Sequence, residues 1–411
     1  RVLFYAQQHG DEPAGKDALL YLVQRFLDHP ERLPEEVELT LIPTLNPDGA
    51  VAGTRMNGRG ADLNRDHLRL AQPETRTFYR VVRRVRPHLA VDGHEFSRDP
   101  ESWTAKGWIR WPLITLDGMS HPLLPEAARA LAQRRVAEAQ PLMEAAGIPY
   151  TRYTVGGPPP DEELRPSTPE VDDGRNGVGS HGAVSFIIES GIRHHAQDPQ
   201  ADLGLRVEAY LRLFDHLLGD APWRREVRQA AEAMRRRPLP PFLPVNAFWA
   251  TTPGTSADVR VQDLTTGQSL SIPCADVMST LVVKAHVPTP RAYAIAPEAA
   301  ARFLPVLEGH GLAFTTLVGP QVLPAEACRL LRYEEPEDPD YHRHSDRTWV
   351  QRGPRQPLTL PAGTLVVPLD QPLALRVVQV LEPCLLYGLY SYADFRALVA
   401  PDGTLPVRRL F

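Results

Sequence analysis

Three residues near the start of the sequence have the chemistry and spacing of a zinc site. His9 and Glu12 follow the strand-like segment 2–6, and Gly10 between them permits a tight turn. His94 ends the mainly apolar segment 89–94. Two imidazoles and one carboxylate leave one coordination position open for water, as in catalytic zinc sites. We expect these residues to bind one Zn²⁺; otherwise His9 caps a turn and His94 is an ordinary strand-end histidine.

Acidic residues elsewhere in the sequence could complete this site. Metal-bound imidazoles usually donate their second N–H to a carboxylate, and Asp62 and Asp92 are the candidates. Hydrolysis at zinc also needs a carboxylate that takes a proton from water and passes it to the leaving group. Glu189 fits this role because it directly follows the apolar segment 184–188. A carboxylate without a functional role there would have a large desolvation cost.

Two alternatives to a catalytic Glu189 stay open. A salt bridge to Arg193 or Arg175 would make it a structural residue, and Glu95, next to His94, is the rival candidate for the base.

A glycine-containing loop between the predicted ligand segments carries Arg55, Arg59 and Arg65. A guanidinium there can bind a carboxylate through two hydrogen bonds or stabilise an oxyanion, although loop arginines are commonly solvated surface. The segment 46–49, Asn-Pro-Asp-Gly, predicts a turn after a strand.

The elements that must position these residues alternate between strand and helix over the first 235 residues. This order predicts an α/β sandwich with a largely parallel or mixed sheet, whose ligands bind beyond the carboxyl ends of the strands. The expected strands are 2–6, 38–43, 89–91 and 183–189, and the expected helices are 14–26, 73–85, 125–146, 203–218 and 223–237.

A proline-rich connector at 238–244 marks the predicted domain boundary. We expect a catalytic domain over 1–237 and a smaller β-rich α+β domain over 245–411, with one helix near 298–310. The acidic loop 333–347 contains His342 and His344, which we interpret as exposed rather than metal-binding.

Composition and charge narrow the function classes. The net charge is −5, no basic stripe is present and no apolar run is long enough to span a membrane, so neither nucleic acid nor membrane is an expected partner. The three cysteines, without metal or redox spacing, are interpreted as free or buried thiols, which slightly favours a cytoplasmic location. The sequence starts without Met and enters a strand at once, which leaves open whether residues precede it.

These motifs together resemble the zinc carboxypeptidases of the carboxypeptidase A type, in a bacterial branch with an appended C-terminal domain. The resemblance covers residues 1 to about 220 and rests on His9-x-x-Glu12, Asn46-Pro-Asp-Gly49, Arg55, Asp62-x-Asn64-Arg65, His94, Gly174-Arg175-Asn176 and Glu189. It implies a three-layer sandwich with a mixed central sheet. The family's tyrosine upstream of the catalytic glutamate has no counterpart in 167–174, and Tyr150 and Tyr153 lie further upstream.

The resemblance also implies roles for individual residues. His9, Glu12 and His94 would bind zinc, with Asp62 orienting a ligand histidine. Glu189 would be the general base and Arg55 would polarise the scissile carbonyl. The residues that would bind the substrate are Asn64, Arg65 and Arg175.

The expected function is therefore a metallocarboxypeptidase that hydrolyses C-terminal peptide bonds by attack of zinc-bound water, assisted by Glu189. The alternative is a zinc amidohydrolase of the succinylglutamate desuccinylase or aspartoacylase type, acting on N-acyl amino acids. Either substrate would carry a free carboxylate. The oligomeric state and the role of the second domain are left open.

Overall fold

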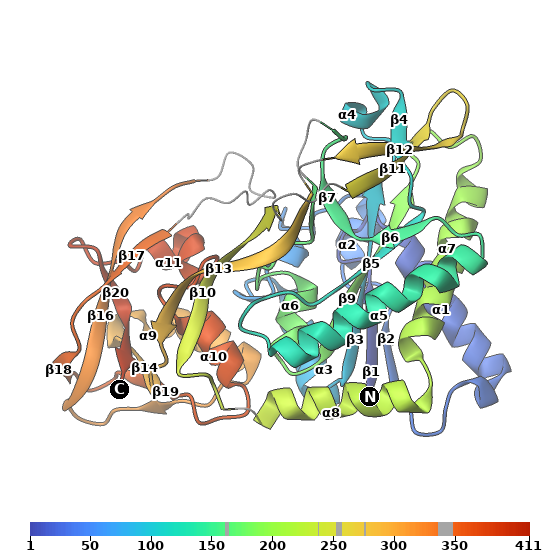
Figure 1. Cartoon of the computed structure of the whole chain (residues 1–411). Coiled ribbons are helices and arrows are strands. Elements are labelled where there is room, and N and C mark those ends of the chain that lie inside the picture. Colours follow the sequence, from blue (N-terminus) through green and yellow to red (C-terminus); the bar gives the residue numbers. More distant parts are fainter. Residues whose placement is uncertain (161–163, 237, 252–256, 275–276, 336–347) are drawn as a thin grey trace.

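A mixed six-stranded sheet forms the centre of the N-terminal half (Figure 1). The computed structural model describes residues 1–160, 164–236, 238–251, 257–274, 277–335 and 348–411. All neighbouring strands of this sheet are parallel except β9 and β5. In spatial order the strands are β2 (Leu39–Ile42), β1 (Val2–Ala6), β3 (Leu89–Ser97), β9 (Val184–Ile192), β5 (Ile114–Gly118) and β6 (Tyr150–Arg152).

Helices cover both faces of this sheet, and alternation along the strands decides which side chains meet them. On β1, Phe4 packs in the core of the first face and Tyr5 in the core of the second. Helices of the first face are α1 (Pro13–Asp28), α5 (Glu126–Ala145), α7 (Pro199–Leu218) and α8 (Ala221–Arg236). Helices of the second face are α3 (Pro73–Val85) and α6 (Gly174–Gly179). The predicted three-layer sandwich with a mixed sheet is confirmed.

The C-terminal half is β-rich, as predicted, and its strands pair antiparallel. Its large sheet packs against α9 (Pro297–His310) and α10 (Ala374–Leu381) around a separate apolar core. The strands of this sheet are β14 (Ala292–Ile295), β15 (Thr315–Thr316), β16 (Gln321–Tyr333), β17 (Thr348–Arg352), β18 (Gln356–Leu360), β19 (Leu365–Pro368) and β20 (Thr404–Leu410). A short helix, α11 (Ala393–Arg396), follows α10. The expectation of a single helix near 298–310 is wrong, because further helices follow it among the described residues.

Two antiparallel strand pairs connect the halves. The ribbon β10 (Phe242–Thr251) and β13 (Met278–Pro288) leads to the hairpin β11 (Ala257–Asp263) and β12 (Ser269–Cys274). The hairpin lies over the N-terminal half, where β11 pairs with β4 (Trp108–Arg110) (Figure 1). The remaining elements are α2 (Pro47–Ala52), α4 (Glu101–Thr104), β7 (Thr154–Gly156), β8 (Leu164–Pro166) and three 3₁₀ turns at Pro30–Arg32, Leu63–Arg65 and Leu389–Ser391.

Several expectations from the sequence need correction. Strand β3 continues to Ser97 and β9 to Ile192, so His94 and Glu189 lie within strands rather than beyond their ends. Segment 46–49 is not a plain turn, because Asn46 caps the helix α2. Strand β10 begins inside the proline-rich connector. The boundary between two domains stays a prediction, and residues 336–347, with His342 and His344, lie outside the described residues.

Two further observations concern the chain as a whole. All three cysteines are free, and Cys274 and Cys328 are buried, as predicted. In the part of the chain that the structure describes, every helix falls short of the length and apolarity that a membrane crossing requires.

Candidate metal centre and active site

His9, Glu12 and His94 come together in one cluster, with ligand atoms that all lie within 4.8 Å of one another. Strand β1 ends at Ala6, opposite Gly93 of β3, so the chain that leaves β1 passes beside His94. Glu12 is the N-cap residue of α1, which Pro13 starts. A strand end and a helix start thus fix two of the three side chains, and the neighbouring strand fixes the third.

Gly10 is needed here for space. A Cβ atom built at Gly10 would lie 1.9 Å from the carbonyl carbon of Gly49, so the backbone of α2 contacts it directly. The Asn46 side chain accepts a hydrogen bond from the Gly49 N–H and donates to the carbonyl of Gln8 at 3.0 Å and that of Arg55 at 3.3 Å. The Asn-Pro-Asp-Gly segment therefore supports the loop that carries His9.

Each histidine of the cluster presents Nδ1 inward and Nε2 to an aspartate. His9 Nε2 lies 3.2 Å from Asp62 Oδ1, and His94 Nε2 lies 3.1 Å from Asp92 Oδ1. On the inner side, Glu12 lies 2.6 Å from His9 Nδ1 and 2.9 Å from His94 Nδ1. The two Nδ1 atoms are 3.2 Å apart.

This donor set suits a zinc ion. When both Nε2 atoms donate to aspartates, each Nδ1 carries a lone pair, and the two lone pairs face each other and a carboxylate. Although burial opposes protonation, the surrounding carboxylates raise the pKa values of His9 and His94, the latter well above its usual value. Burial also opposes ionisation of Glu12, yet the two histidines lower its pKa to about 2. The carboxylates around the two imidazoles therefore favour a positive charge at this position. Two nitrogens with one carboxylate are ligands that zinc accepts.

Glu189 lies directly beside this cluster. It is the register partner of His94 on the adjacent strand, and paired positions project to the same face of a sheet. Burial raises the pKa of Glu189 to about 7, with Glu12 adding to the rise and His94 opposing it. A carboxylate with this pKa can both accept and return a proton near neutral pH.

The structure supports neither alternative for Glu189, the salt bridge to an arginine or the replacement of Glu189 by Glu95 as the base. Among the described residues no arginine forms an ion pair with it, whether Arg193 or Arg175. Glu95 projects to the opposite face of the sheet, where it accepts from the Ala14 N–H at the start of α1 and forms an ion pair with Arg206. Its placement points Glu95 away from the cluster.

The loop arginines differ in how they are placed. Arg55 donates to Asp62 Oδ2 at 2.7 Å, and its Nη1 lies 3.2 Å from His9 Nδ1. The Asn64 carboxamide oxygen accepts from the Gly174 N–H at 2.8 Å, at the start of α6. Arg65 follows Asn64 and acts on the carboxyl of Asp172. Burial and nearby Glu170 raise the pKa of Asp172, and the positive charge of Arg65 opposes this rise. Arg59 is exposed.

Arg175 lies in a buried polar network. Its guanidinium is 3.3 Å from Asp117 Oδ2 and 3.3 Å from Asp173 Oδ2, and it donates to the carbonyl of Thr168 at 2.6 Å. The structure thus brings Arg175 together with acidic residues rather than with the histidine cluster, and its substrate-binding role stays a prediction.

Two residues beside the site were not found from the sequence. The phenol of Tyr153, directly after β6, acts on Glu189 and lowers the pKa of its carboxyl, although this tyrosine lies upstream of the expected interval. Gln8, next to His9, donates to Asp92 at 2.8 Å. No local signal links Tyr153, which the sequence analysis named only as lying upstream, to Glu189, whereas a glutamine next to a predicted ligand histidine could have been considered.

Comparisons with known proteins agree with the resemblance. Residues 1–84 match the sequence model of a family described as zinc carboxypeptidase. Carboxypeptidase 2 of Trichophyton tonsurans is 29% identical over 196 residues, which cover 46% of this chain and 36% of that protein. Carboxypeptidase SOL1 of Arabidopsis thaliana is 37% identical over 94 residues, 19% of either chain. The matched region thus spans just over a third of the first relative.

A solved metallo-carboxypeptidase from Burkholderia cenocepacia is also similar, with 19% identity, a TM-score of 0.38 and coverage of 53% of this chain and 56% of that one. The sequence comparisons confirm the predicted resemblance to zinc carboxypeptidases, with a family match over residues 1–84.

Proposed function

We propose that this protein is a zinc metallocarboxypeptidase, which hydrolyses the last peptide bond of a substrate and releases its C-terminal amino acid. The observation that carries the proposal is the cluster of His9, Glu12 and His94 with Glu189 as the register partner of His94. The family match over residues 1–84 supports it independently.

The three cluster residues would hold the zinc ion, and Asp62 and Asp92 would fix the imidazoles in the tautomer that leaves Nδ1 free. When bound, zinc would supply Lewis acidity, which makes water more acidic and polarises a carbonyl group.

Glu189 would act as the base. It accepts a proton from the water that attacks the scissile carbonyl carbon, and it returns this proton to the amine nitrogen when the C–N bond breaks. The phenol of Tyr153 would stabilise the ionised form of Glu189, whose pKa it lowers. Because burial raises the pKa of Glu189 to about 7, its carboxylate is a stronger base than that of an ordinary glutamate.

Arg55 and the pair Asn64 and Arg65 would bind the substrate. Arg55 lies beside His9, where its guanidinium can donate to the oxyanion that forms on the carbonyl oxygen. Arg65 and Asn64 would bind the terminal carboxylate, for which a planar guanidinium is well suited. This anchoring restricts hydrolysis to the end of a peptide.

The test is release of free amino acids from short peptides with free or amidated C-termini, assayed beside N-acyl amino acids with the zinc-loaded protein. We expect release from peptides with a free C-terminus. Hydrolysis confined to N-acyl amino acids would overturn the proposal in favour of a deacylase.

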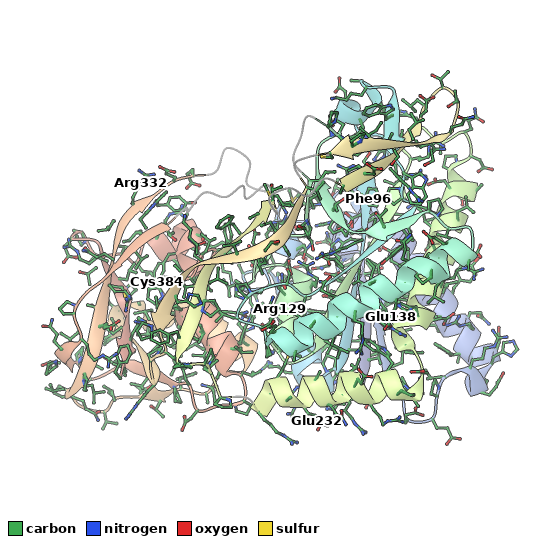
Figure 2. The ribbon with its side chains drawn as sticks, in the orientation of Figure 1. Phe96, Arg129, Glu138, Glu232, Arg332 and Cys384 are labelled. Carbon is green, nitrogen blue, oxygen red and sulfur yellow. The ribbon has the colours of Figure 1, made fainter. Side chains whose placement is uncertain are left out.

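A substitution of Glu189 tests whether this residue is the base. Glu189→Gln is expected to retain one zinc per chain and to lose turnover by about 10²–10⁴-fold. Glu138→Gln, an exposed glutamate on α5 (Figure 2), is the matched control and should keep full activity. An active Glu189→Gln protein would move the base elsewhere.

A further inference from the structure

A cavity of about 400 Å³ lies beside the strand neighbours of Glu189. The register partner of Glu189 on β5 is Thr115, and the partner of Thr115 on β6 is Thr151. Both threonines line the cavity, as does Tyr153, whose phenol acts on the pKa of Glu189. The cavity therefore lies on the same face of the sheet as the predicted base, on its β5–β6 side, and its volume is typical of ligand pockets.

The C-terminal half supplies one wall of this cavity. Asp258, Val259 and Arg260 of β11 line it. Strand β11 is held in place by pairing with β4, and Arg98 donates to Gln262 Oε1 at 3.0 Å. Figure 1 shows the β11–β12 hairpin lying over the N-terminal half, and Figure 2 labels Phe96 of β3 next to it.

Cationic and aromatic groups dominate the lining. The Arg110 guanidinium lies 5.3 Å from the ring centroid of Trp103 and 5.7 Å from that of Phe96, and Arg260 lies 4.9 Å from that of Trp111. Arg110 also donates to the carbonyl of Gly156 at 3.2 Å. Within the described ranges, neither Arg110 nor Arg260 forms an ion pair.

The other charges of the lining do not neutralise these two arginines. Arg152 is engaged by Asp117 at 2.9 Å, and Asp258 is the single carboxylate among the described lining residues. The Arg110 guanidinium is partly buried against aromatic faces and forms no ion pair among the described residues, although the charge of Glu189 acts on it at longer range, and such a group favours an anionic ligand. The pocket thus suits a carboxylate on an apolar stem.

The position of the cavity relative to the predicted anchor indicates which part of a peptide enters it. Asn64 contacts the start of α6, and α6 packs against β3 and β9. The cavity begins at Thr115, the partner of Glu189, and continues to Phe96, the partner of Gly191 further along β9. Helix α6 instead contacts Asp117, the partner of Ile187, so it lies on the other side of Glu189 along the strand. A peptide whose terminal carboxylate is near Asn64 and Arg65 therefore extends past Glu189 with the residues that precede the scissile bond.

On the basis of the proposed function, we propose that this cavity binds the residues preceding the scissile bond, and that Arg110, assisted by Arg260 from the C-terminal half, selects acidic side chains there. The enzyme is then a carboxypeptidase that prefers peptides with glutamate or aspartate before the released residue.

The test compares leucine release from three acetylated tripeptides, Glu-Glu-Leu, Gln-Gln-Leu and Lys-Lys-Leu. Wild-type protein is expected to have a kcat/KM for Glu-Glu-Leu at least about tenfold above that for Gln-Gln-Leu, with Lys-Lys-Leu lowest. Arg110→Gln should bring the first two values together, Arg110→Lys should retain part of the preference, and Arg260→Gln should reduce it less because Arg260 is exposed. Arg134→Gln, an exposed arginine on α5, is the control and should keep the wild-type ratio.

Binding gives a second readout that does not need turnover. In the Glu189→Gln background, the acidic tripeptide should change the fluorescence of Trp103 and Trp111, and Arg110→Gln should weaken its Kd about tenfold but not the Kd of Gln-Gln-Leu. Equal rates and equal affinities for the acidic and amide peptides would overturn the selectivity. Absence of leucine release from every peptide would instead contradict the proposed function, while the binding ratio would still decide this inference.

Discussion

The carboxamide of Gln8 donates to both carboxylate oxygens of Asp92, with N···O distances of 2.9 and 2.8 Å. The carboxamide oxygen accepts from His67 Nε2 at 2.6 Å, so Gln8 is itself held in one orientation. Since Asp92 faces His94 Nε2, the tautomer of a predicted zinc ligand depends on a residue that touches no metal.

Gln8→Leu should therefore weaken zinc binding. Without the amide, the Asp92 carboxylate loses two hydrogen bonds and no longer fixes the His94 imidazole, and the loss of such a partner typically costs about 10–100-fold in metal affinity. Competition with a chelator of known affinity measures the zinc Kd. Gln24→Leu, an exposed glutamine on α1, serves as the control, and an unchanged Kd in Gln8→Leu would refute the role of Gln8.

Tyr153→Phe should move the acid limb of the pH profile to higher pH. The base is active only when ionised, so kcat/KM rises as pH rises through the pKa of Glu189, which burial brings to about 7. The Tyr153 phenol favours the ionised form of Glu189, so its removal should raise this pKa. Bound zinc moves the acid limb of the profile to lower pH in both proteins, so the difference in pH between the two limbs is the informative quantity. Superimposable profiles would show that the phenol does not act on Glu189.

Arg65→Ala should raise KM for peptides with a free C-terminus by about 10–100-fold, because a charge-assisted contact to the terminal carboxylate is lost. For amidated analogues, KM or the inhibition constant should change little. Arg59→Ala removes an exposed arginine from the same loop and should leave both classes of peptide unaffected. Equal effects of Arg65→Ala on free and amidated peptides would exclude the anchoring role.

Acid should destabilise the protein through buried neutral histidines. Burial, together with the charge of Arg376, lowers the pKa of His310 well below its usual value. The same two causes lower the pKa of His181. Below pH about 6.5 the unfolded chain then binds more protons than the folded one, so the free energy of unfolding is greatest above that pH and falls as pH decreases.

His310→Gln tests this linkage. Removing one such group should reduce the slope of the free energy of unfolding against pH by up to about 1.4 kcal/mol per pH unit between pH 6.5 and 5. Urea unfolding of both proteins at several pH values, with zinc at the same concentration, measures the slopes. Identical slopes would mean that His310 does not remain neutral in the folded protein.

Local patterns predicted the helices better than the extent of the strands. The periodicity of residues 73–85 gave α3 with its observed bounds, because its apolar face and terminal signals are all local. Strand β3 was expected to end at Val91, since Asp92, Gly93 and His94 have low strand propensity. Pairing with β1 and β9 extends it, and this tertiary contact is invisible in one sequence.

The same limit applies to the site. His9 and Glu12 are close in sequence, and their convergence could be inferred from spacing. Tyr153 reaches Glu189 only because β6 and β9 both border β5, and Arg260 reaches the cavity only because β11 pairs with β4. Contacts of this kind depend on sheet order, which spacing along the chain does not encode.

The contacts between the halves also limit how this chain can be divided or recombined. From α10, Arg376 donates to the backbone carbonyl of His67, whose ring holds Gln8, and β11 shields the edge of β4. A gene truncated near residue 240 would encode a fragment in which the edge of β4 is unpaired, which favours self-association. The fragment would also lack the contact of Arg376 with His67, the residue whose ring holds Gln8. Transplanting either half alone would separate the predicted zinc-binding cluster from the wall of the cavity that β11 supplies, so both proposals require the two halves together.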